Sequence, residues 1–480
     1  MQIKSILSCV LGFAMITAPF AEATPNKKKN NKPAAPSQQK KEVRANFPAQ
    51  YEADYQKFIT KLRELTKSNS FDLSPALFII LRATNDEFSI EPWMQRAADE
   101  GEPAAILFMA QKNLINIPEE HYRAPEILTT VTQIKKAADH KYVPAIVAYS
   151  QCLDKGIGVF PNHAAAERLL IEACSSGCFR TRFEWLRQTG RLEKFEDLQR
   201  PEVKAEVERG NHYILHHVSL MAPDHKTMLK LLVQAANKGN GYARYELSEF
   251  YAQFDIARSY KILALAVKAR NPDALYRMGM YLINPPATLE INVGPIRNTA
   301  EGVVMLKMAS IVGQNDARLQ LARMYMDGKN GLEKDPIKAY RHITTGAIMS
   351  GAPALLAAQG FMMLQGIGTN KDTETGLKLI QAAASRGYTH AKSLLGYIYY
   401  HGIGVDKNLS TAVMHLEDAA AHKDPIAFIY LALMFDADNQ PEKVQYYLEH
   451  AERTLHDKAN TIFNYYKQNF NGWFMKPFPI

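Results

Sequence analysis

A segment of this chain recurs at a nearly fixed interval, and that recurrence limits the possible folds more than any other feature. Residues 350–368 superpose on residues 386–404 at an offset of 36, and both segments end in Gly-Ile-Gly. The same three residues stand at 156–158. A period of this length is typical of solenoids, in which each short unit buries its apolar face only against its neighbours.

A glycine, or a polar residue in its place, ends one helix of each unit. These marker residues are Gly101, Lys141, Gly177, Gly239, Arg270, Gly313, Gly351, Gly387 and Lys423. Because glycine adopts positive φ at little steric cost, we expect a left-handed turn at each marker. The long gap between Gly177 and Gly239 predicts one degenerate repeat plus an extension at 179–222.

The first helix of the next pair is predicted to begin near the small residue that stands four positions after each marker. Its pattern is a small residue, a large one four later, a small one five later and a large one eight later, as in Ala391, Leu395, Gly396 and Tyr399. These spacings place the four side chains on one face of an α-helix and do not fit the two-residue period of a strand. We therefore predict an all-α fold of stacked helix pairs, with Leu395 and Tyr399 in the core.

The last complete unit resembles a Sel1-like repeat, a relative of the tetratricopeptide repeat. The resemblance rests on Ala391, Leu395, Gly396, Tyr399, Gly402, Gly404 and residues 407–420. It extends over about residues 70–453 and is strongest between 300 and 423, although Leu355 and Gln359 depart from the pattern. It implies a right-handed α/α superhelical solenoid that binds proteins or acts as a scaffold. Exported bacterial members of the family are linked to envelope complexes and, in some intracellular pathogens, to host interaction.

The first 23 residues are typical of a secretory signal peptide. Lys4 precedes an apolar run at 6–18, and Ala21-Glu22-Ala23 fits a cleavage site. The run is too short for a membrane-spanning helix, and no later segment offers one. We expect an exported bacterial protein that is periplasmic or secreted.

The predicted domain organisation follows the chain. It comprises a signal peptide at 1–23, a basic disordered linker at 24–46, N-terminal helices with a degenerate first repeat at 47–102, Sel1-like repeats at 103–178, the degenerate region at 179–222, further repeats at 223–455, and a C-terminal capping helix and tail at 456–480.

Most of the net charge of +8 lies in the linker. Residues 24–46 hold seven lysines and arginines against Glu42, so the body after residue 46 is nearly neutral. A nearly neutral body without a nucleic-acid motif argues against binding to DNA or RNA. The linker is either a plain solvated tether or a loose contact with anionic envelope components.

Histidine and cysteine residues offer two chemical alternatives. His212 and His216 have the i, i+4 spacing of metal ligands, but no acidic partner follows, and a partly exposed polar helix face is the favoured explanation. Cys174 fits core packing, and its spacing from Cys178 would also allow a disulfide bond between the two. Cys152 has no obvious disulfide partner. We predict no metal, no cofactor and no catalytic residue, because nucleophile and phosphate-binding motifs are missing.

The predicted binding site is the inner wall formed by the first helix of each pair. Positions two, six and nine after the small residue should face inward, which gives candidate partner-binding residues Arg323, Phe361, Leu364, Tyr397, Tyr400 and Leu433. Aromatic and apolar groups of this kind suit a helix or an extended peptide. Alternatively, these side chains pack on one another.

The leading functional hypothesis is an exported protein–protein interaction scaffold without enzymatic activity. A cell-wall or carbohydrate-binding module is the alternative, and it should show aromatic platforms beside carboxylates and amides. Some cysteine-rich members of the family are described as hydrolysing β-lactams, but this chain lacks their regular cysteine pair in each repeat.

Overall fold

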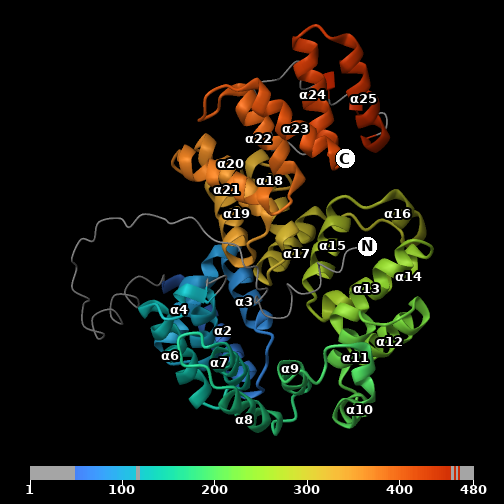
Figure 1. The fold of residues 1–480 in the computed structure, drawn as a ribbon. Helices are drawn as coiled ribbons and strands as arrows, with labels where there is room; N and C mark the ends of the chain where they lie inside the picture. The colour runs from blue at the N-terminus through green and yellow to red at the C-terminus, as the bar shows by residue number, and fades with distance from the viewer. Residues whose placement is uncertain (1–48, 115–118, 456–458, 461–462, 465–480) are drawn as a thin grey trace, which may run out of the picture. The chain divides into compact units, whose positions relative to one another are not determined.

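A computed structural model describes residues 49–114, 119–455, 459–460 and 463–464 (Figure 1). Within these ranges the chain is helical and holds no strand, which confirms the predicted all-α fold. The predicted signal peptide at 1–23, the predicted linker at 24–46 and most of the predicted capping segment at 456–480 lie outside the described residues. No helix in the described ranges is both long and apolar enough to cross a bilayer.

The chain divides into two compact units after Gln314. The α-helices of unit 1 are α2 (Glu52–Lys67), α3 (Ser74–Thr84), α4 (Ile90–Asp99), α5 (Pro103–Lys112), α6 (Pro125–Asp139), α7 (Val143–Lys155), α8 (His163–Cys174), α9 (Phe179–Gln188), α10 (Pro201–Glu208), α11 (His212–Ser219), α12 (His225–Asn237), α13 (Gly241–Ala252), α14 (Ile256–Lys268), α15 (Pro272–Ile283), α16 (Ala287–Val293) and α17 (Thr299–Ile311). Its 3₁₀ turns are η2 (Ala49–Tyr51), η3 (Glu87–Ser89), η4 (Glu119–His121) and η5 (Phe195–Gln199).

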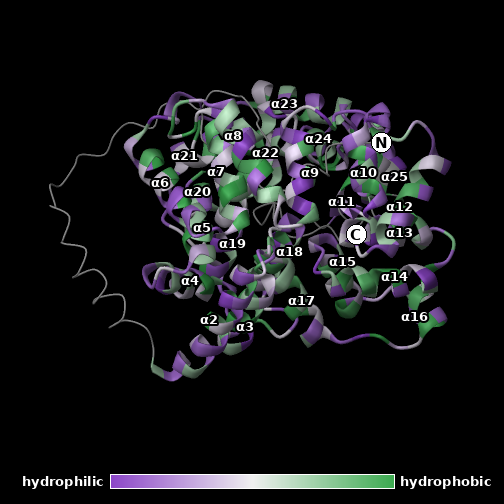
Figure 2. Cartoon of the chain, turned by 90° about the horizontal axis from the view of Figure 1, so that it is seen from below, coloured by the Kyte–Doolittle hydropathy of each residue, from purple (hydrophilic) through white to green (hydrophobic). Residues whose placement is uncertain are grey.

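Unit 2 consists of four successive helix pairs. They are α18 (Asn315–Asp327) with α19 (Pro336–Ser350), α20 (Pro353–Gln365) with α21 (Thr373–Ser385), α22 (Thr389–His401) with α23 (Leu409–Ala421), and α24 (Pro425–Ala437) with α25 (Pro441–Leu455). Each second helix also contacts the first helix of the next pair, so the pairs stack as a solenoid. Hydrophilic and hydrophobic residues intermix along these short helices (Figure 2), as expected when one side of each is buried.

The turns between pairs confirm the marker residues. All nine adopt positive φ, including the non-glycine residues Lys141, Arg270 and Lys423 at 61°, 56° and 61°. A further marker was missed: Gly210, with φ of 92°, ends α10 and leads into α11. The degenerate region therefore holds α9, η5 and α10 before this turn and α11 after it.

Side-chain caps begin most second helices. An asparagine or aspartate accepts a hydrogen bond from the backbone N–H three residues ahead at Asn162, Asp224, Asp255, Asn298, Asp335, Asp372 and Asn408. Such a cap satisfies an amide that the helix leaves without a partner and contributes about 1 kcal/mol. Together with the positive-φ turns, these caps fix where each helix starts and stops.

Small residues bring the two helices of a pair close together. A Cβ added to Gly360 of α20 would lie 2.5 Å from the carbonyl oxygen of Gly376 in α21, and the reverse distance is also 2.5 Å. Gly279 and Gly302 face each other similarly between α15 and α17. These small positions therefore set how closely the paired helices approach.

The segment between α2 and α3 contacts distant parts of unit 1. Asn69 Oδ1 accepts a hydrogen bond from the Val143 amide at 3.0 Å, and the Tyr142 hydroxyl donates to the Ser70 carbonyl at 2.8 Å. Asp72 lies 3.4 Å from the Arg270 guanidinium. Unit 1 thus departs from a simple row in which each repeat contacts only its sequence neighbours.

A buried lysine makes the longest of these connections. Lys307 of α17 is 2% exposed and donates from Nζ to the carbonyl oxygen of Asn85, at the end of α3, at 2.7 Å. Its amine also lies 3.4 Å from the Glu87 carboxylate, which is 7% exposed. Because a buried charge is costly without a partner, this contact ties the first helices of unit 1 to its last.

Candidate functional site

The first helices of unit 2 form one wall of its solenoid. α22 contacts α20 on one side and α24 on the other, in addition to its own partner α23. A side chain on this row can therefore lie beside one from the next repeat. The arrangement brings together residues that are more than thirty positions apart in sequence.

The structure divides the six candidate residues into two groups. Phe361, Leu364 and Leu433 are 4%, 0% and 5% exposed, so they pack within unit 2 and offer no surface. Arg323, Tyr397 and Tyr400 are partly exposed. Binding by any of the six stays a prediction.

A group of aromatic residues joins α22 to α24, and we call it the tyrosine cluster: Tyr397, Tyr400, His401 and Tyr430. The ring centroids of Tyr397 and Tyr430 are 5.5 Å apart, and those of Tyr397 and His401 are 4.5 Å apart. The Tyr400 and His401 rings meet edge to face at 5.0 Å. Aromatic pairs at these separations attract one another and hold their rings in fixed orientations.

The tyrosine cluster is electrically neutral near pH 7. Burial raises the pKa of Tyr397 and of Tyr400, while it lowers the pKa of His401, so each ring favours its uncharged form. The Lys407 amine lies 5.2 Å from the centroid of the Tyr400 ring and supplies a cation at the edge. Such a surface can pack against apolar or aromatic groups and can bind a nearby carboxylate.

Sequence reasoning missed His401 and Tyr430. Tyr430 is three positions after Ala427, one residue away from a predicted inward position, and is 3% exposed. The expectation that Tyr399 lies in the core beside Leu395 was also wrong in part. Leu395 is buried, but Tyr399 is partly exposed and stacks on His415 of α23, with centroids 5.7 Å apart.

A buried carboxylate links α22 to the start of α24. Asp424 accepts hydrogen bonds from the Ile426 amide at 3.1 Å, from the Ser393 hydroxyl at 2.6 Å and from the His390 ring at 2.8 Å. The hydrogen bond to Asp424 raises the pKa of His390. Ser393 donates to the carboxylate rather than to the histidine, so the three residues do not have the nucleophile–base–acid order of a hydrolytic triad.

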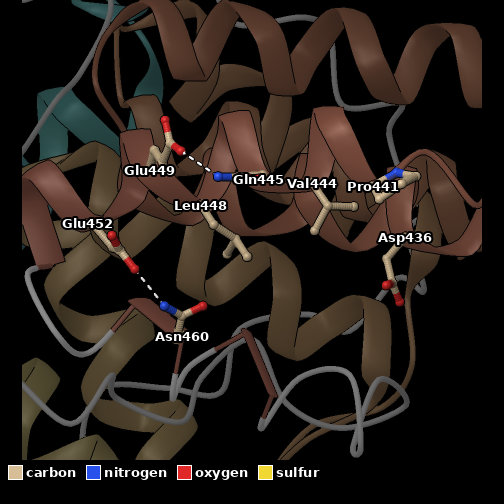
Figure 3. A pocket seen from close by; sticks show the side chains of 8 residues that line it. All are labelled: Asp436, Pro441, Val444, Gln445, Leu448, Glu449, Glu452 and Asn460. Atoms are coloured by element: carbon tan, nitrogen blue, oxygen red, sulfur yellow. Dashed lines mark hydrogen bonds between the residues drawn. The ribbon is translucent and has the colours of Figure 1, made fainter.

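A cavity of about 410 Å³ opens beside α25 (Figure 3). It is lined by the apolar residues Pro441, Val444 and Leu448, the amides Gln445 and Asn460, and the carboxylates Asp436, Glu449 and Glu452. Gln445 donates to Glu449 at 3.0 Å and Asn460 to Glu452 at 2.5 Å. No aromatic ring is among the lining residues.

Cys152, Cys174 and Cys178 are free thiols, so the possible bridge between Cys174 and Cys178 is not formed. Burial raises the pKa of Cys152 to about 12 and that of Cys174 to about 11, so few thiolates exist at neutral pH. These two thiols therefore behave as small packing groups.

The predicted histidine pair has structural partners. His216 Nε2 lies 3.1 Å from a carboxylate oxygen of Glu246, and the His212 ring lies 3.3 Å from the Asn240 amide. No cluster of three or more potential metal ligands occurs in the described ranges.

Comparison with known proteins identifies the repeats. The family model "Sel1 repeat" matches residues 143–178, 315–347, 354–388 and 389–424. The chitin synthase regulator SKT5 of Saccharomyces cerevisiae is 27% identical over 117 residues, which cover 24% of this chain and 17% of that protein.

Two solved structures are also similar to this chain. One is c5321, a protective antigen of uropathogenic Escherichia coli strains displaying an SLR fold, with 16% identity, 85% of this chain and 97% of that chain covered, and a TM-score of 0.41. The other is a Sel1 repeat protein from Oxalobacter formigenes, with 19% identity, 66% and 92% covered, and a TM-score of 0.36. The four family matches, together with the helix pairs and positive-φ turns described above, show that this chain contains Sel1 repeats.

Proposed function

We propose that this protein is an exported, non-catalytic scaffold that binds a segment of a partner protein at the inner row of first helices in unit 2. The tyrosine cluster is the observation that carries the proposal. It combines partly exposed, rigid aromatic rings with hydroxyl groups and one cation at its edge. Tyrosines of this kind dominate the energetics of many protein interfaces, because they bury large areas at a small entropic cost.

Phe361, Leu364 and Leu433 take a supporting role in this proposal. They pack beneath the surface, so the contact area consists of Tyr397, Tyr400 and the partly exposed Arg323. A partner segment with apolar side chains and one carboxylate fits this surface, because the carboxylate can pair with Lys407.

Photocrosslinking in living cells tests the binding site. A photoreactive amino acid at position 400 should capture a defined protein, while the same amino acid at the exposed position 371 should not. Tyr397→Ala should abolish capture at position 400 and change unfolding stability by no more than about 1 to 2 kcal/mol. Equal capture at both positions, or capture unaffected by Tyr397→Ala, would place the binding site elsewhere.

Export is tested separately. Residues 1–46 should direct a fused reporter enzyme out of the cytoplasm, and replacing the apolar residues at 6–18 by polar ones should retain it. Retention of the unaltered fusion in the cytoplasm would refute export while leaving the binding proposal untouched.

The carbohydrate-binding alternative is favoured by one observation. The cavity beside α25 has three carboxylates and two amides, which are typical sugar ligands, although no aromatic platform lines it. Glu449→Gln with Glu452→Gln should abolish sedimentation with purified cell-wall polymer if the cavity binds sugar. Under the scaffold proposal, these substitutions leave capture at position 400 unchanged.

A further inference from the structure

The helices α12 and α14, each the second helix of its pair in unit 1, carry exposed cations and no acidic residue. On α12, Lys226, Lys230 and Val233 are exposed at successive turns. The α14 helix exposes Arg258, Lys261, Leu265 and Lys268 in a row with spacings of three and four. We call these seven residues the basic face. Residues at such spacings lie along one side of a helix, so each row presents its side chains in a single direction.

The two rows belong to adjacent helices. Arg244 of α13 donates from Nε to the Ala236 carbonyl of α12 at 3.0 Å and from Nη1 to the Leu265 carbonyl of α14 at 3.4 Å. Ile262 of α14 packs in the same apolar cluster as Leu232 of α12. Figures 1 and 2 also place α12, α13 and α14 side by side. The basic face is therefore one continuous surface.

The charges on this face are not neutralised by the part of the protein that the structure describes. None of the four lysines forms an ion pair with a described residue, and the Arg258 guanidinium lies over the Tyr251 ring at 4.0 Å. Asp224 and Asp255, which directly precede α12 and α14, are N-caps that accept backbone hydrogen bonds at the helix starts. Other second helices differ, since α21 and α23 carry the exposed residues Glu374, Glu417 and Asp418.

We propose that the basic face docks the protein on an anionic lipid surface. Lysine is a strongly hydrated point charge that suits loose attraction to a layer of phosphate groups, whereas specific recognition of carboxylates usually employs arginine forks. Four of the five cations are lysines, and the arginine is already stacked on a tyrosine. Val233 follows Lys230 on α12 and Leu265 lies between Lys261 and Lys268 on α14; they are 37% and 44% exposed and can enter the headgroup layer. This contact is separate from the proposed partner site in unit 2.

The test compares two full-length variants of equal net charge. One carries Lys226→Gln, Lys230→Gln, Lys261→Gln and Lys268→Gln. The matched control carries Lys136→Gln, Lys334→Gln, Lys371→Gln and Lys423→Gln, four exposed lysines outside the basic face that form no ion pair with a described residue. Glutamine has nearly the helix propensity of lysine, and circular dichroism verifies that both variants fold. The basic segment at 24–46 is the same in both.

Binding is measured by sedimentation with vesicles of phosphatidylcholine, or of equimolar phosphatidylcholine and phosphatidylglycerol. The unaltered protein should bind only the anionic vesicles, and less at high salt. Because each lysine near an anionic surface strengthens binding about fivefold, the basic-face variant should bind at least about a hundredfold more weakly. The control variant should lose no more than a few fold.

Two results would overturn the proposal. Equal losses in the two variants would show that only net charge matters. Binding of soluble polyglutamate through the basic face, with no binding to anionic vesicles, would instead assign the face to an acidic protein. As a further check, Val233→Ala with Leu265→Ala should weaken binding to vesicles and leave binding to polyglutamate unchanged.

Discussion

Gly360→Ala tests whether the close approach of paired helices limits the stability of unit 2. The added Cβ would lie 2.5 Å from the carbonyl oxygen of Gly376, 2.9 Å from Cγ1 of Ile380 and 3.1 Å from Cβ of Leu379. The nearest of these atoms belongs to the backbone and cannot rotate away. The α20 and α21 helices must therefore separate, which also loosens the apolar contacts on either side of the crossing.

Two opposing effects set the expected magnitude. Insertion of a methyl group into a tightly packed contact costs about 1 to 3 kcal/mol, while alanine gains up to about 1 kcal/mol over glycine inside a helix. We expect a net loss of about 1 to 2 kcal/mol, or roughly 3 to 6 °C in melting temperature for a unit of this size. Circular dichroism melting measures this change, and Ala358→Gly in the same helix measures the propensity effect alone.

Rescue experiments separate the possible clashes. Ile380→Val shortens a side chain near the new methyl group but leaves the Gly376 carbonyl in place, so it should not restore the melting temperature of Gly360→Ala. A Gly360→Ala protein as stable as the parent would refute the reasoning, because the helices would then tolerate a wider separation at no cost.

Two other predictions concern unit 1 and are measured by urea unfolding with fluorescence of Trp93 and Trp185. Burial lowers the pKa of His217 to about 4, so the stability supplied by its neutral ring is complete above pH 6.5 and is lost as the pH falls towards 4. The loss should reach at most about 3 kcal/mol, and His217→Gln should flatten this dependence; an unchanged pH profile would contradict the assignment. Lys307→Met leaves the buried Glu87 carboxylate without its cation and should lower the free energy of unfolding by about 3 to 5 kcal/mol. The double variant Lys307→Met with Glu87→Leu should recover most of this loss. Equal losses in the single and double variants would argue against a charge effect.

The architecture could be predicted from the sequence because the residues that determine each turn and helix end are close together in the chain. Positive φ at a turn depends on a few neighbouring residues, so Gly351 and Gly387 marked their turns, and even Lys141 and Arg270 could be placed by their spacing. The asparagine and aspartate caps are equally visible in the sequence. Gly210 was missed because the repeat before it is irregular and includes η5.

The site was harder to predict because burial depends on neighbouring repeats. Nine consecutive residues of α24, from Ile426 to Met434, are buried, so the helix has no polar side to show which residues face inward. Leu433 was therefore predicted to lie on the inward surface, and Tyr430 was not included in that prediction. The contacts of Lys307 with residues 85–87 were invisible for another reason: no periodic pattern relates positions that are more than 200 residues apart.

The two units differ in whether their own chain covers residues at the predicted inward positions. In unit 1, Phe71 packs against the apolar cluster of α7 that includes Val147, a residue at a predicted inward position, and the Arg180 guanidinium lies 5.5 Å from the Phe71 ring. A partner segment would have to displace residues 69–72, which are held nearby by the same chain and so compete at a high effective concentration. In unit 2, Tyr397 and Tyr400 keep partly exposed rings on the first helices. An external segment should therefore bind at the tyrosine cluster in preference to the inner side of α7.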